Sequence, residues 1–228
     1  MVTHLSLKQT NPDDLCLDQL PTAAKNAFLY LAELPLLKNT DWYLAGGTAL
    51  ALQVGHRKSV DLDFFTPSAD FDRTSLERTL IATKQWETSY QQAGTLYGKL
   101  KGAKASFIAY PFFKPSPARL ACGNIRILVP EDIAVMKIIA MSQRGRKRDF
   151  VDLYWYALNR EPLAAVVKRT PGQYPGQERN LPHIIKSLTY FNDADGDPMP
   201  ELYFNANWKS IKIFFQKEAR KIADELLV

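Results

Sequence analysis

Two aspartates separated by a single residue, Asp61 and Asp63, are the side chains of this sequence best suited to chemistry. Side chains of a β-strand alternate between its faces, so both carboxylates are predicted on one face. Val60, Leu62 and Phe64 are predicted to point into a core. Neighbouring carboxylates repel each other unless one takes a proton or a cation lies between them. Mg²⁺ commonly binds one or two carboxylates together with substrate phosphate oxygens, so the pair predicts a Mg²⁺ site.

A glycine pair lies shortly before these aspartates. Residues 42–45 read as a strand and residues 48–54 as a helix, with Gly46 and Gly47 forming the turn between them. Glycine lets a ligand approach the backbone, and the free N–H groups of a helix N-terminus favour an anion. Thr48 adds a hydroxyl, and Ser59 shares the predicted face of Asp61. The segment therefore predicts a triphosphate site; an ordinary turn beside a half-exposed polar strand is the alternative.

A third group of polar residues follows Pro130. Lys137 is a lone cation in the apolar run IAVMKIIAM, so it must reach solvent or find an anion such as a triphosphate. Asp149 and Asp152 are three residues apart and share a face of the next predicted helix. Asp149 also suits a helix N-terminus. Asp152 is predicted to orient Lys137 or to activate an attacking hydroxyl.

The elements that position these residues fall into two groups. Before Pro130 the patterns predict an α/β half; after it they predict helices and one exposed loop, which gives an α+β (α/β) fold with domains 1–129 and 130–228. The predicted helices are 17–37, 48–54, 74–84, 131–143, 148–158, 163–168, 181–191 and 207–227; the strands are 42–45, 60–66, 86–91, 95–101, 105–112 and 124–129; the loop is 170–180.

The charge distribution favours a polyanionic partner. The net charge is +5, and residues 88–130 contain no Asp or Glu. The same stretch holds six basic residues: Lys99, Lys101, Lys104, Lys114, Arg119 and Arg126. Such a region suits a nucleoside triphosphate or RNA, while a solvated sheet face is the alternative.

Composition excludes several classes of protein. The hydrophobic fraction of 46% and charged fraction of 23% are those of a globular chain, and no apolar run is long enough to span a bilayer. The first residues lack a signal-peptide core, and two cysteines cannot form a disulfide framework. We therefore expect a cytoplasmic protein without membrane contact.

Three motifs in this order, GGTALAL, HRKSVDLDFF and KRDFVDLYW, resemble the AbiEii/AbiGii-type nucleotidyltransferases, a branch of the DNA polymerase β-like superfamily. The resemblance covers residues 41–65 closely and 130–156 well. It implies a nucleotidyltransferase-like mixed sheet flanked by helices, followed by an all-helical C-terminal half. It also implies Mg²⁺-dependent transfer of NMP from an NTP to an acceptor, most of all RNA or tRNA. Members include toxins, so an antitoxin is a further expected partner.

Motif matching assigns roles residue by residue. It implies four catalytic residues, of which the first two also bind the metal: Asp61, Asp63, Lys137 and Asp152. It implies four nucleotide-binding residues, Gly47, Arg57, Ser59 and Asp149, and the predicted helix start adds Gly46 and Thr48 to them.

One departure from the superfamily concerns the third carboxylate that many members place on a neighbouring strand. Ser106 stands in the predicted strand where that carboxylate is expected. Either the pair Asp61 and Asp63 suffices, or Asp149 or Asp152 contributes, or catalysis is lost. A nucleotide- or RNA-binding protein without activity, and an enzyme that modifies a protein or a small molecule, are the alternative functions.

Overall fold

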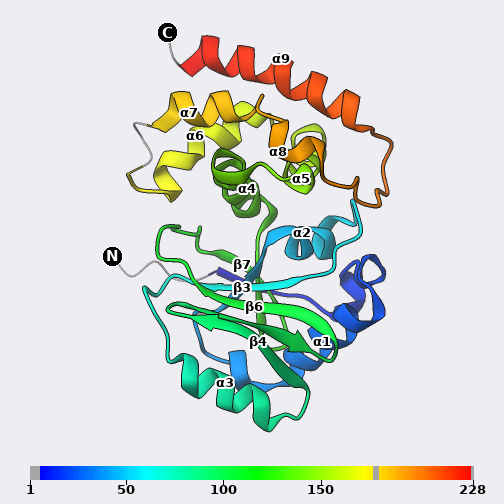
Figure 1. Cartoon of the computed structure of the whole chain (residues 1–228), viewed down its shortest axis with the longest axis vertical. Coiled ribbons are helices and arrows are strands. Elements are labelled where there is room, and N and C mark those ends of the chain that lie inside the picture. Colours follow the sequence, from blue (N-terminus) through cyan, green and yellow to red (C-terminus); the bar gives the residue numbers. More distant parts are fainter. Residues whose placement is uncertain (1–5, 177–179, 227–228) are drawn as a thin grey trace. The chain divides into compact units, whose positions relative to one another are not determined.

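The computed structural model describes residues 6–176 and 180–226 (Figure 1). The chain divides into two compact units between Val129 and Pro130. The first is a sheet with helices, blue to green in Figure 1, and the second is helical, green to red.

Within residues 6–129, eight strands form one mixed sheet in the order β1-β7-β8-β2-β3-β6-β5-β4. The pairs β1–β7, β2–β8 and β3–β6 are parallel, and the other pairs are antiparallel. The mixed sheet that the family resemblance implies is thereby confirmed. The strands are β1 (Ser6–Gln9), β2 (Tyr43–Ala45), β3 (Leu62–Thr66), β4 (Trp86–Gln92), β5 (Thr95–Leu100), β6 (Ala103–Ala109), β7 (Ala118–Cys122) and β8 (Ile125–Leu128).

The strand patterns of the sequence miss two elements and misplace the bounds of others, most of all those of β3 and β6, which were predicted at 60–66 and 105–112. β1 and β7 were not predicted, because neither short segment shows an apolar alternation of its own. The prediction that Val60 points into the core is wrong, since its side chain is 48% exposed. The chain joins the sheet only at Leu62, so the alternation that buries Leu62 and Phe64 does not reach back to residue 60.

Helices cover both faces of this sheet (Figure 1). Helix α1 (Thr22–Glu33) and helix α3 (Arg73–Ala82) lie on one face, and helix α2 (Gly46–Val54) lies on the other. α1 is shorter than predicted because 3-10 turns at Leu17–Gln19 and Pro35–Leu37 occupy the ends of the range. On the α1/α3 side, the buried rings of Phe64 and Phe107 stack at 5.1 Å. The core thus fixes the orientation of β3 and β6, on which the site depends.

Unit 2 is built of helices, as predicted. They are α4 (Pro130–Arg144), α5 (Lys147–Asn159), α6 (Leu163–Gln173), α7 (Leu181–Ser187), α8 (Asn192–Asp195) and α9 (Trp208–Leu226). α5, α6 and α7 pack on α4 and also contact α9. In the ranges that the structure describes, no helix is both long and apolar enough to cross a membrane.

The predicted loop 170–180 is wrong for its first part. α6 continues to Gln173, and Thr170 and Tyr174 are 0% and 2% exposed. Together with Leu163, Val166 and Val167 these side chains form one helical stripe, so burial of that stripe overrides the local preference of Pro171 and Gly172. Residues 177–179 of the predicted loop lie outside the described residues.

Candidate nucleotide-binding and catalytic site

The glycine pair begins a helix. α2 starts at Gly46, so the residues predicted as a turn form the first helical turn. Gly46 has a φ of +71°, which favours glycine. The antiparallel β2–β3 register places Ala45 opposite Asp63. A Cβ added to Gly46 would lie 3.4 Å from Asp63 Oδ2. A carboxylate oxygen of Asp63 therefore lies beside the start of α2, where the first N–H groups have no partner within the helix.

Gly47 lies against a buried guanidinium. A Cβ added to Gly47 would lie 2.1 Å from Arg57 Nη2 and 3.4 Å from Ser59 Oγ. Arg57 is 4% exposed, and its Nη1 donates to the carbonyl of Lys58 at 2.9 Å. A side chain on residue 47 would displace the guanidinium from this position. The charge of Arg57 therefore sits beside the positive end of α2, where an anion is favoured.

This packing makes Gly47→Ala a sharp test of the helix start. The added methyl must displace Arg57, so we expect a loss of about 1–3 kcal/mol in the free energy of unfolding, measured with urea. We also expect weaker NTP binding, measured by fluorescence titration. Gly172→Ala is the matched control, because a Cβ there meets nothing within 4 Å, and alanine in a helix is slightly stabilising. Unchanged stability of Gly47→Ala would contradict the packing.

Thr48 ties the helix to the chain that leads into β3. Its Oγ1 lies 2.9 Å from Ser59 Oγ, within hydrogen-bond distance, and also hydrogen-bonds to the backbone carbonyl of Asp61. Thr48 and Ser59 are 2% and 8% exposed. The two hydroxyls therefore fix the backbone of Asp61 relative to the start of α2.

Asp63 is fixed by a residue from the neighbouring strand. β3 and β6 are parallel, with Asp63 paired to Ser106, and Ser106 Oγ donates to Asp63 Oδ1 at 2.6 Å. Asp63 is half-buried, whereas Leu62 and Phe64 on the other face are fully buried. Ser106 thus occupies the position where a third carboxylate was expected, and it orients the carboxylate of Asp63. The sequence identified this position but not the hydrogen bond, which depends on the strand register.

The acidic side chains at the site fit a cation that is shared with a substrate. Across residues 6–176 and 180–226, no group of three or more His, Cys, Asp or Glu residues could hold a metal ion. Asp61 and Asp63 offer hard carboxylate oxygens, and Mg²⁺ accepts one or two carboxylates when phosphates and water complete its shell. The donor set therefore suits a divalent cation that arrives with a nucleotide rather than an all-protein cage.

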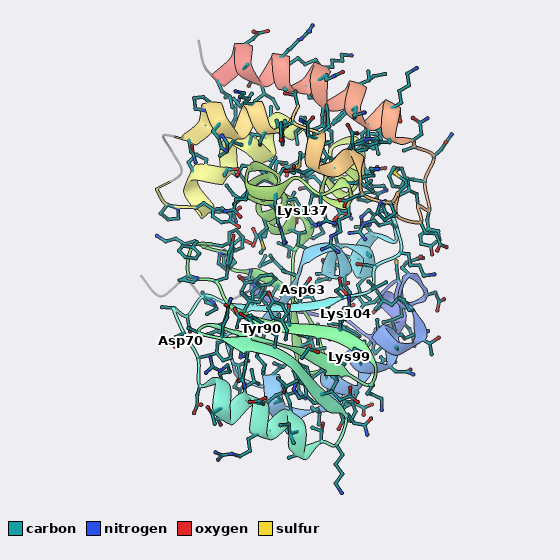
Figure 2. The ribbon with its side chains drawn as sticks, in the orientation of Figure 1. Asp63, Asp70, Tyr90, Lys99, Lys104 and Lys137 are labelled. Atoms are coloured by element: carbon teal, nitrogen blue, oxygen red, sulfur yellow. The ribbon has the colours of Figure 1, made fainter. Side chains whose placement is uncertain are left out.

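The second cluster of predicted residues lies in the helical unit. Lys137 Nζ on α4 is 2.6 Å from Asp149 Oδ1 and 2.9 Å from Asp152 Oδ2 on α5. The side chains of Lys137, Asp149 and Asp152 are 9%, 6% and 0% exposed. A solvent-facing Lys137 is thereby excluded, because the lysine is buried against two carboxylates. Figure 2 shows Lys137 on α4.

The ten predicted site residues thus fall into two clusters. Seven belong to the sheet unit: Gly46, Gly47, Thr48, Arg57, Ser59, Asp61 and Asp63. Three belong to the helical unit: Lys137, Asp149 and Asp152. Ser106 joins the first cluster through Asp63.

A mixed sheet whose β2–α2–β3 segment joins a Gly-Gly helix start to two aspartates defines a nucleotidyltransferase fold. Two solved structures share it. A candidate nucleotidyltransferase from H. pylori aligns with a TM-score of 0.53 and 19% identity, covering 90% of this chain and 97% of that chain. MenT4, the nucleotidyltransferase toxin Rv2826c from Mycobacterium tuberculosis H37Rv, aligns with a TM-score of 0.55 and 15% identity, covering 90% and 86%.

The chain belongs to the AbiEii nucleotidyltransferase toxin family. The profile described as "Nucleotidyl transferase AbiEii toxin, Type IV TA system" matches residues 30–96 and 111–224. The Aquifex aeolicus (strain VF5) relative named "Uncharacterized protein aq_aa25" is 35% identical over 185 residues, covering 79% of this chain and 87% of the relative. The family resemblance and the enzyme class predicted from the sequence are confirmed: the protein is a nucleotidyltransferase.

Proposed function

We propose that the protein transfers NMP from an NTP to the end of an RNA, tRNA most of all, with Mg²⁺ bound by Asp61 and Asp63. One observation carries the proposal. Asp63, held by Ser106, lies beside the glycine start of α2, where a Cβ on Gly46 would come within 3.4 Å of its Oδ2. A cation-binding carboxylate next to an anion-binding helix start is what a Mg²⁺–triphosphate requires.

The residues of the sheet unit have different roles in binding the NTP and its cation. The N–H groups at Gly46, Gly47 and Thr48 hold phosphate oxygens, and Arg57 adds positive charge beside them. Thr48 and Ser59 keep Asp61 in place through the contacts described above. A bound divalent cation neutralises phosphate charge and orients the phosphoryl group. The protein supplies positioning and electrostatics, the main requirements of phosphoryl-type transfer.

The predicted site residues of the helical unit, Lys137, Asp149 and Asp152, form a buried ion cluster. The motif match assigns Lys137 to the reaction, and Asp149 and Asp152 fix its ammonium group within the helical unit. Of the two predicted roles for Asp152, orientation of Lys137 is favoured. A carboxylate that is 0% exposed and 2.9 Å from the lysine is poorly placed to take a proton from an incoming hydroxyl.

The charge distribution supports an RNA acceptor, and family membership supports a toxin role. Residues 88–130 carry only basic charges, which suits RNA. Membership of a toxin family supports a role in growth arrest in the cytoplasm, with an antitoxin as its counterpart. Expression of the chain in a bacterial host with and without the neighbouring gene product tests that role by growth rate.

The direct test of transfer uses labelled nucleotides. Cell lysate is incubated with the protein and each α-³²P-labelled NTP, with Mg²⁺ or with EDTA, and then divided for RNase treatment. We expect label from one NTP in an RNase-sensitive band of tRNA size, absent with EDTA. An RNase-resistant protein band would replace RNA with a protein acceptor.

A second candidate function, nucleotide binding without transfer, is favoured by Ser106. A serine occupies the strand position where a third carboxylate was expected, and it hydrogen-bonds to Asp63 instead. NTP binding with no label on any acceptor in the lysate would support this candidate against the transferase.

A further inference from the structure

The face of the sheet that bears Asp63 continues across three more strands to the edge. The register pairs Asp63 with Ser106, Ser106 with Tyr97 and Tyr97 with Tyr90, from β3 through β6 and β5 to β4. Paired residues lie on one face, so these four side chains form a row across the sheet. Three strand spacings of about 4.8 Å place Tyr90 roughly 14 Å from Asp63. Figure 2 marks Asp63 and Tyr90 on these strands.

Two exposed aromatic rings end the row. Tyr90 and Tyr97 stack with centroids 6.2 Å apart and planes at 30°, and they are 53% and 39% exposed. A cross-strand aromatic pair stabilises a hairpin by a fraction of a kcal/mol to about 1 kcal/mol, which would account for the stacking alone. It does not account for the lysines beside it.

The next row of the same face carries unpaired positive charge. Lys99 on β5 and Lys104 on β6 lie directly opposite each other, an arrangement that destabilises a sheet. Among the residues that the structure describes, neither lysine forms an ion pair. Glu87 on β4 is opposite Lys99 and leaves this row with a charge of +1. Figure 2 labels Lys99 and Lys104. A bound polyanion would offset the repulsion.

These observations together select one kind of ligand. Stacked aromatic rings beside exposed cations form the surface that binds single-stranded nucleic acid, with bases on the rings and phosphates on the lysines. The family profile passes over residues 97–110, the segment that contains Tyr97, Lys99 and Lys104. Membership of the family therefore does not by itself account for this surface.

We infer that Tyr90, Tyr97, Lys99 and Lys104 form a platform that binds a single-stranded segment of the acceptor RNA and leads its end toward Asp63. The inference rests on the proposed function for the identity of the acceptor. Binding to the platform is separable from transfer, because Tyr97 and Tyr90 lie two and three strands away from β3, which carries Asp63.

The test measures RNA binding without turnover. The full chain is titrated into a fluorescein-labelled, mixed-sequence 12-nucleotide single-stranded RNA in EDTA without NTP, and anisotropy is followed at several salt concentrations. The Tyr90→Ala/Tyr97→Ala protein is expected to bind about 10- to 100-fold more weakly. Lys99→Glu/Lys104→Glu is expected to weaken binding and to lower the slope of log K against log salt by about 1.4.

Matched variants separate the platform from folding and from general charge. Tyr90→Phe/Tyr97→Phe keeps both rings and is expected to retain binding. Lys8→Glu reverses an exposed lysine on β1, at the opposite edge of the sheet, and is expected to retain it too. NTP affinity should be unchanged in every variant.

Two outcomes would overturn the inference: a wild-type protein that does not bind the RNA, or alanine variants that bind it as tightly as wild type. The proposed function can fail independently, because a protein that binds this RNA through the platform but labels no RNA in lysate refutes only the transfer.

Discussion

Asp61→Asn and Asp63→Asn are each expected to reduce nucleotidyl transfer by about 10³-fold or more, with the fold intact. Asparagine keeps the size of the side chain but removes the charge that binds a divalent cation. Loss of a metal ligand removes several kcal/mol of transition-state stabilisation, and each 1.36 kcal/mol is tenfold in rate. The measurement is incorporation of labelled NMP into RNA, alongside the thermal unfolding midpoint.

Two further variants serve as comparisons for this test. Asp70→Asn, in the exposed loop after β3, removes an aspartate of the same unit and should retain full activity (Figure 2). Ser106→Ala leaves both carboxylates but removes the 2.6 Å hydrogen bond to Asp63, so an intermediate loss is expected. Full activity of Asp61→Asn would rule out the metal site proposed here.

Lys137→Met is expected to destabilise the helical unit by about 3–5 kcal/mol, measured by urea unfolding. The substitution leaves Asp149 and Asp152 close together with side chains that are 6% and 0% exposed and without their cation. Removing one partner from a buried ion pair costs about this much, because the remaining charge is uncompensated. Lys209→Met, an exposed lysine on α9, is the matched control and should change stability little.

A triple variant separates stability from catalysis. Lys137→Met/Asp149→Asn/Asp152→Asn removes all three charges, and replacing a buried ion cluster by neutral groups is often close to neutral for stability. We expect the triple variant to regain most of the stability that Lys137→Met loses, yet to remain impaired in transfer. Recovery of both stability and activity would show that Lys137 has only a structural role.

Much of the sheet unit could be predicted because its signals are local. β2, α2 and β3 follow from apolar alternation, two glycines and a short helical run within some twenty residues. The prediction failed where contacts with residues distant in the sequence determine the secondary structure. β1 and β7 are strands because they pair with each other and β7 pairs with β8. Residues 170–173 are helical because Thr170 and Tyr174 are buried with the rest of their stripe.

The sequence by itself determined the chemistry that this protein brings: two aspartates one residue apart, a Gly-Gly-Thr helix start and a lysine in an apolar helix. Those features depend on residue type and short spacing, so they can be predicted from the local geometry of strands and helices. Only the tertiary structure decided that Ser106 holds Asp63, and that two tyrosines extend the same row to the sheet edge. Strand register sets such contacts, and a shift of one residue would turn each side chain to the other face.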